Sequence, residues 1–385
     1  MVTIFEFLGE DPIENVITCM NYRADKCVFF GYRAEITKQK KSLDHFLKKY
    51  CKTGQVIFVE VPHDDLKSTL FIMRRAIETE KGQRIFFDLT GGEDLPLVAF
   101  GMLAKEYDAP VHSYNVEDDR LLDFSSDRPT GISHLDREQS VKLDLDRFIE
   151  LRGGIINYSL HKGLKDLDDP EYDSDIRKLW EVTCRHDGFW TSFSAFLREN
   201  MIPEKDYLVE RKEETVLEAL NKDNSELKTQ YRLDVMLQDL ADIGVITEYS
   251  RNNGKYHFRF KNENIKQCLW DGGSILELHT YQVEKERSDD CMMGVHLDWD
   301  GILSKSIGTD VYNEIDVLCL NGNVPSFISC KNGRMSGSTT LHALYELNIV
   351  AQRFGGKYAK KILVTTQPVG DVYLKRAAEM GIEVR

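Results

Sequence analysis

The sequence lacks the long hydrophobic runs and targeting signals of membrane and secreted proteins. No stretch approaches the roughly 18 consecutive apolar residues of a membrane span. The opening residues, MVTIFEFLGEDP, lack the basic and apolar regions of a secretory signal. The eight cysteines form no CxxC pair and do not cluster with histidine. We therefore expect a cytoplasmic protein with free thiols, without membrane contact and without a zinc site.

Common catalytic motifs and positive charge are also scarce. The sequence has no Walker loop, serine nucleophile elbow, complete GxGxxG run or HExxH spacing. The 385 residues carry a net charge of −14. The last 85 residues hold 10 Lys and Arg against 7 Asp and Glu, whereas the first 300 hold 40 against 57. This balance argues against a basic surface for duplex DNA and makes the C-terminal part the better candidate for nucleic-acid contact.

Three regions of different pattern follow one another along the chain. Residues 1–140 alternate strands with helices, which predicts a Rossmann-like parallel sheet with crossover helices. Residues 141–270 are mainly helical and end with two helices and a hairpin around RNNGK, which predicts a winged helix-turn-helix or a spacer built like one. Residues 271–385 again mix strands and helices. The predicted fold class is a multidomain α/β protein with a winged-helix-like middle.

The first candidate site follows the predicted strand in RIFFDLTGG. Ligands of open α/β sheets bind beyond the carboxyl ends of the strands, and paired glycines there let the backbone approach a phosphate. The loops after three predicted strands supply the candidate ligand-binding residues, which are Gly9, Glu10, Tyr32, Arg33, Thr90, Gly91 and Gly92. A tight strand-to-helix turn without a ligand is the alternative interpretation of the Gly-Gly pair.

The second candidate site pairs Asp316 in NEIDVL with Lys331 in SFISCK. The two residues lie on consecutive predicted strands, and Glu277 and Glu346 lie on flanking predicted helices. A carboxylate that holds Mg²⁺ or Mn²⁺ beside a lysine is suited to phosphodiester hydrolysis. We name Asp316, Lys331, Glu277 and Glu346 as catalytic candidates, and Asp316, Glu277 and the Cys330 carbonyl as metal ligands. The alternative is an ordinary hairpin with one exposed acid and one exposed lysine.

The N-terminal motifs resemble those of a known family. FLGEDPIENV after the first predicted strand and LTGG after a later one resemble the CARF domain, the CRISPR-associated Rossmann fold, over about residues 1–130. The resemblance implies that a cyclic oligoadenylate binds across a homodimer interface. The family's Thr-Gly-Gly-Thr-Lys run ends here in Glu93 and Asp94. Two carboxylates at these positions disfavour an anionic ligand.

The C-terminal motifs resemble the nuclease domain of CARF-containing CRISPR ancillary nucleases. NEIDVL, FISCKNG and LYELNIVAQRFGGKYAK stand in the order of a restriction-endonuclease-like PD-(D/E)xK domain. The resemblance implies that Asp316 binds metal, that Lys331 is catalytic, and that Glu277 is the acid of the upstream helix. Ser329 stands where the family has the acid of (D/E)xK. A neutral hydroxyl there weakens metal binding unless another acid compensates.

Two functions are compatible with the sequence. The first is a cyclic-oligoadenylate-gated, metal-dependent endonuclease that acts as a homodimer on DNA or RNA, with single-stranded nucleic acid expected as substrate. The second is a non-catalytic CARF sensor or nucleic-acid-binding regulator whose nuclease domain has degenerated. Asp316 and Lys331 favour the first function, whereas Ser329, Glu93 and Asp94 favour the second.

Overall fold

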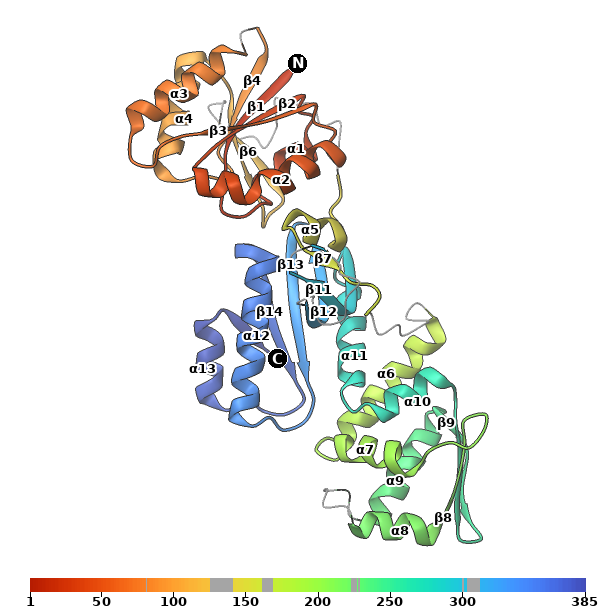
Figure 1. Cartoon of the computed structure of the whole chain (residues 1–385). Coiled ribbons are helices and arrows are strands. Elements are labelled where there is room, and N and C mark those ends of the chain that lie inside the picture. Colours follow the sequence, from red (N-terminus) through yellow and green to blue (C-terminus); the bar gives the residue numbers. More distant parts are fainter. Residues whose placement is uncertain are drawn as a thin grey trace.

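The chain folds into three parts whose order in space differs from their order in the sequence. The computed structural model describes all residues except 81, 125–140, 161–168, 223–226, 228, 300 and 303–311. The N-terminal domain lies at one end, and the part that contains β8 to β10 lies at the other (Figure 1). The C-terminal sheet lies between them. The predicted mixed α/β fold class is confirmed, and the C-terminal part directly faces the N-terminal domain.

A six-stranded sheet in the order β3-β2-β1-β4-β5-β6 forms the N-terminal domain. Its elements are β1 (Val2–Phe7), α1 (Ile17–Asn21), β2 (Lys26–Gly31), α2 (Arg33–Lys49), β3 (Gln55–Glu60), α3 (Leu66–Glu78), β4 (Arg84–Asp88), α4 (Asp94–Tyr107), β5 (Val111–Asn115) and β6 (Arg120–Asp123). β1 to β5 pair in parallel, but β6 pairs antiparallel with β5 because the short connection between them makes a hairpin. The predicted border near residue 140 lies outside the described residues.

The middle of the sequence forms a helical part with a small antiparallel sheet in the order β8-β10-β9. Its elements are α6 (Pro170–Arg185), α7 (Trp190–Asn200), β8 (Leu208–Lys212), α8 (Glu213–Lys222), α9 (Gln230–Asp242), β9 (Ile246–Asn252), β10 (Lys255–Phe260) and α10 (Glu263–Trp270). The hairpin predicted from RNNGK joins β9 to β10. Asn253 and Gly254 both have positive φ, at 55° and 69°, as a tight two-residue hairpin turn requires.

The C-terminal sheet has the order β15-β14-β13-β12-β11-β7. Its elements, with the helix that precedes β7, are α5 (Leu145–Leu151), β7 (Ile155–Ile156), α11 (Ser274–Lys285), β11 (Asp290–Asp298), β12 (Tyr312–Asn321), β13 (Val324–Lys331), α12 (Gly337–Gly355), the 3-10 helix η1 (Gly356–Tyr358), β14 (Lys360–Thr365), α13 (Asp371–Glu379) and β15 (Ile382–Val384). β7 comes from the range predicted as the middle domain, yet Ile156 pairs with Leu297 of β11. The C-terminal sheet therefore includes a strand from outside the predicted 271–385 domain.

Helices cover both faces of the C-terminal sheet. Apolar residues of α11 belong to the same buried cluster as Val317 and Ile328. Those of α12 belong to a second cluster with Leu318 and Phe327. This second cluster extends into the N-terminal domain, so the two parts share a continuous core. Within the described ranges, no helix is both long and apolar enough to span a membrane.

Candidate functional site

The N-terminal candidate residues meet in a pocket at the carboxyl ends of β1, β2 and β4. The strand order changes direction between β1 and β4, which is where ligands bind in open α/β sheets. The pocket has a volume of about 370 Å³. Six of the seven predicted residues line it, namely Gly9, Glu10, Tyr32, Thr90, Gly91 and Gly92. Arg33 begins α2 and is exposed, and it is not among the residues that line the pocket.

The glycines allow two loops of the pocket to touch each other. A Cβ atom on Gly91 would lie 2.8 Å from the Gly9 nitrogen and 2.9 Å from the Gly9 Cα. Gly92 has φ of +120°, a conformation that residues with a Cβ rarely adopt. From the sequence, we expect glycine at these positions to let the backbone approach a phosphate. The structure shows another reason for glycine here, because the backbones of the loops after β1 and β4 lie in contact with each other.

Thr90 has a structural role beneath the pocket. Its hydroxyl donates to Asp88, and it accepts a hydrogen bond of 2.8 Å from the backbone N–H of Tyr114. Asp88 is buried and also accepts from the Thr18 hydroxyl. Burial raises the pKa of Asp88, but His112 and the hydrogen bonds from Thr18 and Thr90 outweigh it and lower the pKa below its usual value. The Thr90 hydroxyl therefore holds the loop in place.

The charges that line the pocket are mainly negative. Its acidic residues are Glu10, Glu14, Glu35 and Glu93, and its basic residues are Lys38 and Lys357. Burial, followed by the charge of Glu93, raises the pKa of Tyr32 to about 12. The Tyr32 hydroxyl therefore stays protonated and donates to Glu93 at 3.3 Å. Sequence reasoning missed Lys357, because it comes from η1 of the C-terminal part.

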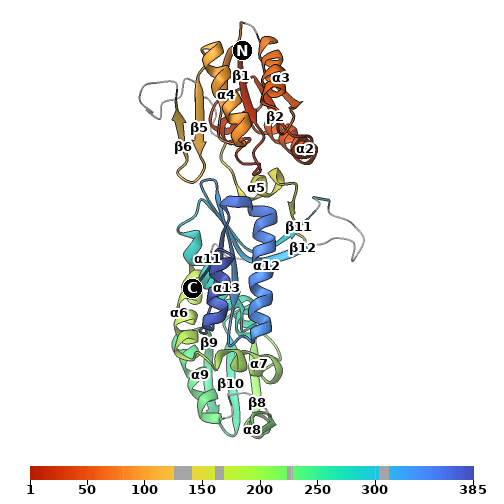
Figure 2. The ribbon, with the colours of Figure 1, turned by 90° about the vertical axis from the view of Figure 1, so that its left-hand side faces the viewer.

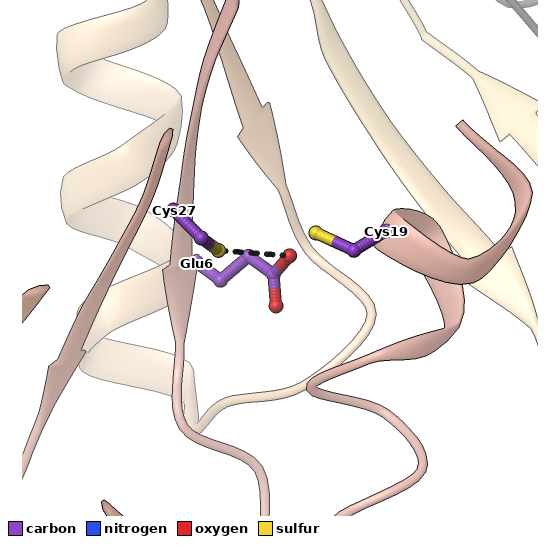
Figure 3. Close-up of side chains that lie close together, drawn as sticks. All are labelled: Glu6, Cys19 and Cys27. Atoms are coloured by element: carbon purple, nitrogen blue, oxygen red, sulfur yellow. Dashed lines mark hydrogen bonds between the residues drawn. The ribbon is translucent and has the colours of Figure 1, made fainter. Parts of the chain in front are cut away.

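A second group of polar side chains lies buried in the same domain. Glu6, Cys19 and Cys27 bring one ligand atom each to within 4.8 Å of one another (Figure 3). The Cys27 thiol donates to Glu6 at 3.6 Å. Burial, with the nearby charge of Asp88, raises the pKa of Glu6 well above its usual value. Burial also raises the pKa of Cys27. Burial therefore favours the neutral, protonated forms of Glu6 and Cys27.

We predict that Glu6→Gln flattens the pH dependence of stability. The folded state holds a proton on Glu6 that the unfolded state releases above the ordinary carboxyl pKa. The wild type therefore loses about 1.4 kcal/mol of unfolding free energy per pH unit relative to the variant, from the ordinary carboxyl pKa up to the raised one. Urea unfolding of both proteins at pH 5, 6 and 7 measures this difference. Parallel profiles would show that Glu6 is ionised in the folded protein.

The C-terminal site forms where β12 and β13 cease to pair. Their register runs from Asn321–Val324 to Val317–Ile328. One residue further, the carboxylate of Asp316 accepts hydrogen bonds from the Cys330 backbone N–H at 2.6 Å and the Ser329 hydroxyl at 3.1 Å. Lys331 Nζ lies 3.4 Å from the same oxygen, Oδ2. Among the described residues, all hydrogen bonds to this carboxylate reach Oδ2. The predicted Asp–Lys pair is thus brought together at a partly exposed edge.

Glu277, in the first turn of α11, lies near the same strand end. The Cys330 thiol contacts Thr280 of α11 at 3.6 Å. Burial raises the pKa of this thiol, and the charges of Asp316 and Glu277 raise it further. Both carboxylates therefore lie close enough to Cys330 to act on it electrostatically. The thiol itself is buried and protonated. The polar groups that Cys330 offers at this site are therefore those of its backbone.

Glu346 has other partners. It accepts a hydrogen bond of 3.3 Å from the Asn313 side chain near the start of β12, and its carboxylate lies 3.8 Å from His342. In the described part of the chain, the Glu6 group is the one set of three potential metal ligands within 4.8 Å, and no such set forms at Asp316. Asp316 and Lys331 are brought together, whereas Glu346 is held by Asn313 and His342.

Comparison with known proteins identifies the C-terminal part. Residues 265–385 match the family model of the Card1-like endonuclease domain. A search of curated proteins gave no match. The chain is similar to protein VC1899 from Vibrio cholerae, with a TM-score of 0.73 and 18% identity over 100% of this chain and 93% of that one. It is also similar to Can2 from Sulfobacillus thermosulfidooxidans, solved with cyclic tetra-adenylate, with a TM-score of 0.64 and 14% identity over the same shares.

These similarities agree with the family resemblance of the sequence motifs. At such identities the two solved structures show the fold of the chain, while the family match concerns its last third. The resemblance to CARF-domain CRISPR ancillary nucleases is confirmed. The chain therefore carries a Card1-like endonuclease domain at its C-terminus, within the fold shared by VC1899 and Can2.

Proposed function

We propose that the protein is a metal-dependent endonuclease gated by a cyclic oligoadenylate. The observation that carries the proposal is the contact of Asp316 with Lys331 at the diverging ends of β12 and β13, inside the matched endonuclease region. A carboxylate and a cation at one partly exposed point suit hydrolysis of a phosphodiester. DNA or RNA is the proposed substrate, with single-stranded nucleic acid expected, and the cytoplasm the proposed location.

The donor groups at Asp316 fit a hard divalent cation such as Mg²⁺ or Mn²⁺. A carboxylate oxygen and a backbone carbonyl are ligands that both ions accept. Because the hydrogen bonds of Asp316 reach Oδ2, Oδ1 is the oxygen offered to the ion, with the Cys330 carbonyl and Glu277 as further candidates. When bound, the ion would polarise the scissile phosphate and lower the pKa of a bound water. Lys331 supplies positive charge for the phosphorane.

The N-terminal pocket is the proposed site of the activating ligand. It lies at the strand ends where such sheets bind nucleotides, and Can2, which shares the fold, was solved with cyclic tetra-adenylate. We propose a homodimer through this domain, because a two-fold symmetric ligand needs a two-fold site. Val98 and Met102 are exposed one turn apart on α4, Phe71 is exposed on the neighbouring α3, and we propose that these apolar side chains face a second copy. Light scattering of the full chain at micromolar concentration measures the predicted mass of two chains.

A non-catalytic regulator is the second candidate, and Ser329 is the observation that favours it. Its hydroxyl donates to Asp316, at the position where the family has a carboxylate. In that case the domain would bind nucleic acid without cutting it. The winged-helix-like part that contains β8 to β10 is another candidate for contact with nucleic acid.

We predict that Ser329→Glu raises metal affinity and activity. The new carboxylate would add a negative charge next to Asp316, with an expected gain of about tenfold, larger with Mg²⁺ than with Mn²⁺. Ala378→Glu, on exposed α13, adds the same charge away from the site and serves as control. Titration of the cleavage rate with each metal measures the effect. No gain would mean that Glu277 or another acid already completes the site.

Cleavage assays test the proposed function. The full chain is incubated with single- and double-stranded DNA and RNA, with Mg²⁺, Mn²⁺ or EDTA, and with or without cyclic tetra-adenylate. The proposal expects cleavage that needs both the metal and the ligand. Binding of nucleic acid without cleavage under every condition would favour the regulator.

A further inference from the structure

The C-terminal part reaches into the N-terminal pocket. Lys357 of η1 lines the pocket, and its ammonium pairs with Glu14 in the loop after β1. The neighbouring Tyr358 hydroxyl donates to the same carboxylate at 2.7 Å. The Lys357 backbone N–H donates to Asp11 at 3.1 Å. Three groups of the C-terminal part thus contact two acids of one N-terminal loop.

Lys357 is placed to meet an anionic ligand. The Glu14 side chain is only 4% exposed, whereas that of Lys357 is 52% exposed. An ammonium has three N–H donors, so the pair with Glu14 leaves donors for a phosphate oxygen. The pocket is lined by four glutamates and two lysines, and the other lysine, Lys38, is on α2 of the N-terminal domain. Without Lys357, only Lys38 would offset the charge of the four carboxylates that line the pocket when a phosphate enters.

The position of Lys357 also connects the pocket to the nuclease site. Lys357 follows the C-terminal end of α12, and α12 begins six residues after Lys331. At about 1.5 Å per residue, this 19-residue helix spans roughly 28 Å. Figure 2 shows it running lengthwise through the C-terminal part, with one end near α5 below the N-terminal domain. A ligand held by Lys357 would therefore contact η1, which directly follows a helix that begins six residues after the candidate catalytic lysine.

We propose that Lys357 is a phosphate-binding residue of the N-terminal pocket, supplied by the nuclease domain of the same chain. The inference rests on the proposed function, since it takes the ligand to be a cyclic oligoadenylate. The binding site is then complete only when the two parts are docked. By thermodynamic linkage, any arrangement of the nuclease domain that moves Lys357 changes ligand affinity, and the ligand favours the docked arrangement by the same factor.

Calorimetric titration of the full chain with cyclic tetra-adenylate tests this role. Lys357→Gln should weaken binding about tenfold or more, because a charge-assisted hydrogen bond is lost. Lys357→Arg keeps the charge and should bind within about threefold of wild type. Lys375→Gln removes one charge from exposed α13 and should bind like wild type. Tyr358→Phe breaks the other contact to Glu14 without removing a cation, and should also bind within about threefold of wild type.

The outcomes separate this inference from the proposed function. A wild type that binds no cyclic tetra-adenylate would overturn the proposed function, and this inference with it. A wild type that binds while Lys357→Gln binds equally well would overturn the role of Lys357 alone. Equal weakening by Tyr358→Phe and Lys357→Gln would trace the effect to docking of the two parts, and would also overturn phosphate binding by Lys357.

Discussion

Asp316→Ala is expected to abolish metal-dependent cleavage. The variant removes the carboxylate that accepts from Ser329 and Cys330 and that lies beside Lys331. Loss of a metal ligand removes several kcal/mol of transition-state stabilisation, so the rate should fall about a thousandfold or more. Single-turnover cleavage of a labelled oligonucleotide with Mg²⁺ measures the loss. Glu383→Gln removes an exposed acid on β15 and should cleave like wild type. Full activity of Asp316→Ala would place the chemistry elsewhere in the protein.

Lys331→Ala separates the roles of the two residues. The ammonium is a neighbour of the proposed metal site and not a ligand of it. The variant should therefore keep its metal affinity, measured by titration with Mn²⁺, while its cleavage rate falls. Loss of metal binding in Lys331→Ala would instead mean that this lysine holds the position of Asp316.

Arg152→Ala is expected to cause the largest loss of stability. Arg152 follows α5 and pairs at 2.5 Å with Asp11, and both side chains are almost completely buried. Its guanidinium also lies 3.9 Å from the centre of the Phe148 ring. Removing the arginine leaves the Asp11 carboxylate buried without the cation of its ion pair, which costs about 3–5 kcal/mol. Urea unfolding of the full chain measures the cost.

Arg74→Ala is the matched control for this pair. Arg74 donates two hydrogen bonds of 2.8 Å to Glu106, so the geometry of this pair is at least as good as that of Arg152 and Asp11. Both side chains of the Arg74 pair are exposed, however. Water screens such a pair and solvates the carboxylate that is left behind. The urea midpoint should therefore move much less than in Arg152→Ala. Equal shifts would show that burial does not decide the strength of these pairs.

The parts of the structure that follow from local pattern could be predicted from the sequence. The turn at Gly322 joins two strands with clear apolar patterns and so fixes their register. That register brings Asp316 next to Lys331. In the same way, glycines after β1 and β4 mark the strand ends where the N-terminal pocket forms.

Other features depend on contacts between distant segments, for which the sequence carries no local signal. Lys357 and Asp11 are 346 positions apart in the chain, and no periodicity connects them. β7 has two residues, too few to show alternation, yet it adds a strand to the C-terminal sheet. Thr90 is expected from the sequence to bind a ligand, but in the fold its hydroxyl bonds to Asp88 and to the backbone of Tyr114.

The dependence of the cleavage rate on cyclic tetra-adenylate concentration shows whether ligand binding in the N-terminal pocket controls hydrolysis at Asp316 and Lys331. We expect a rate near zero without the ligand, and a rise that saturates with a midpoint equal to the Kd from calorimetry. In Lys357→Gln that midpoint should shift by the same factor as the Kd. A cleavage rate that is constant across all ligand concentrations would mean that the pocket does not control the nuclease site.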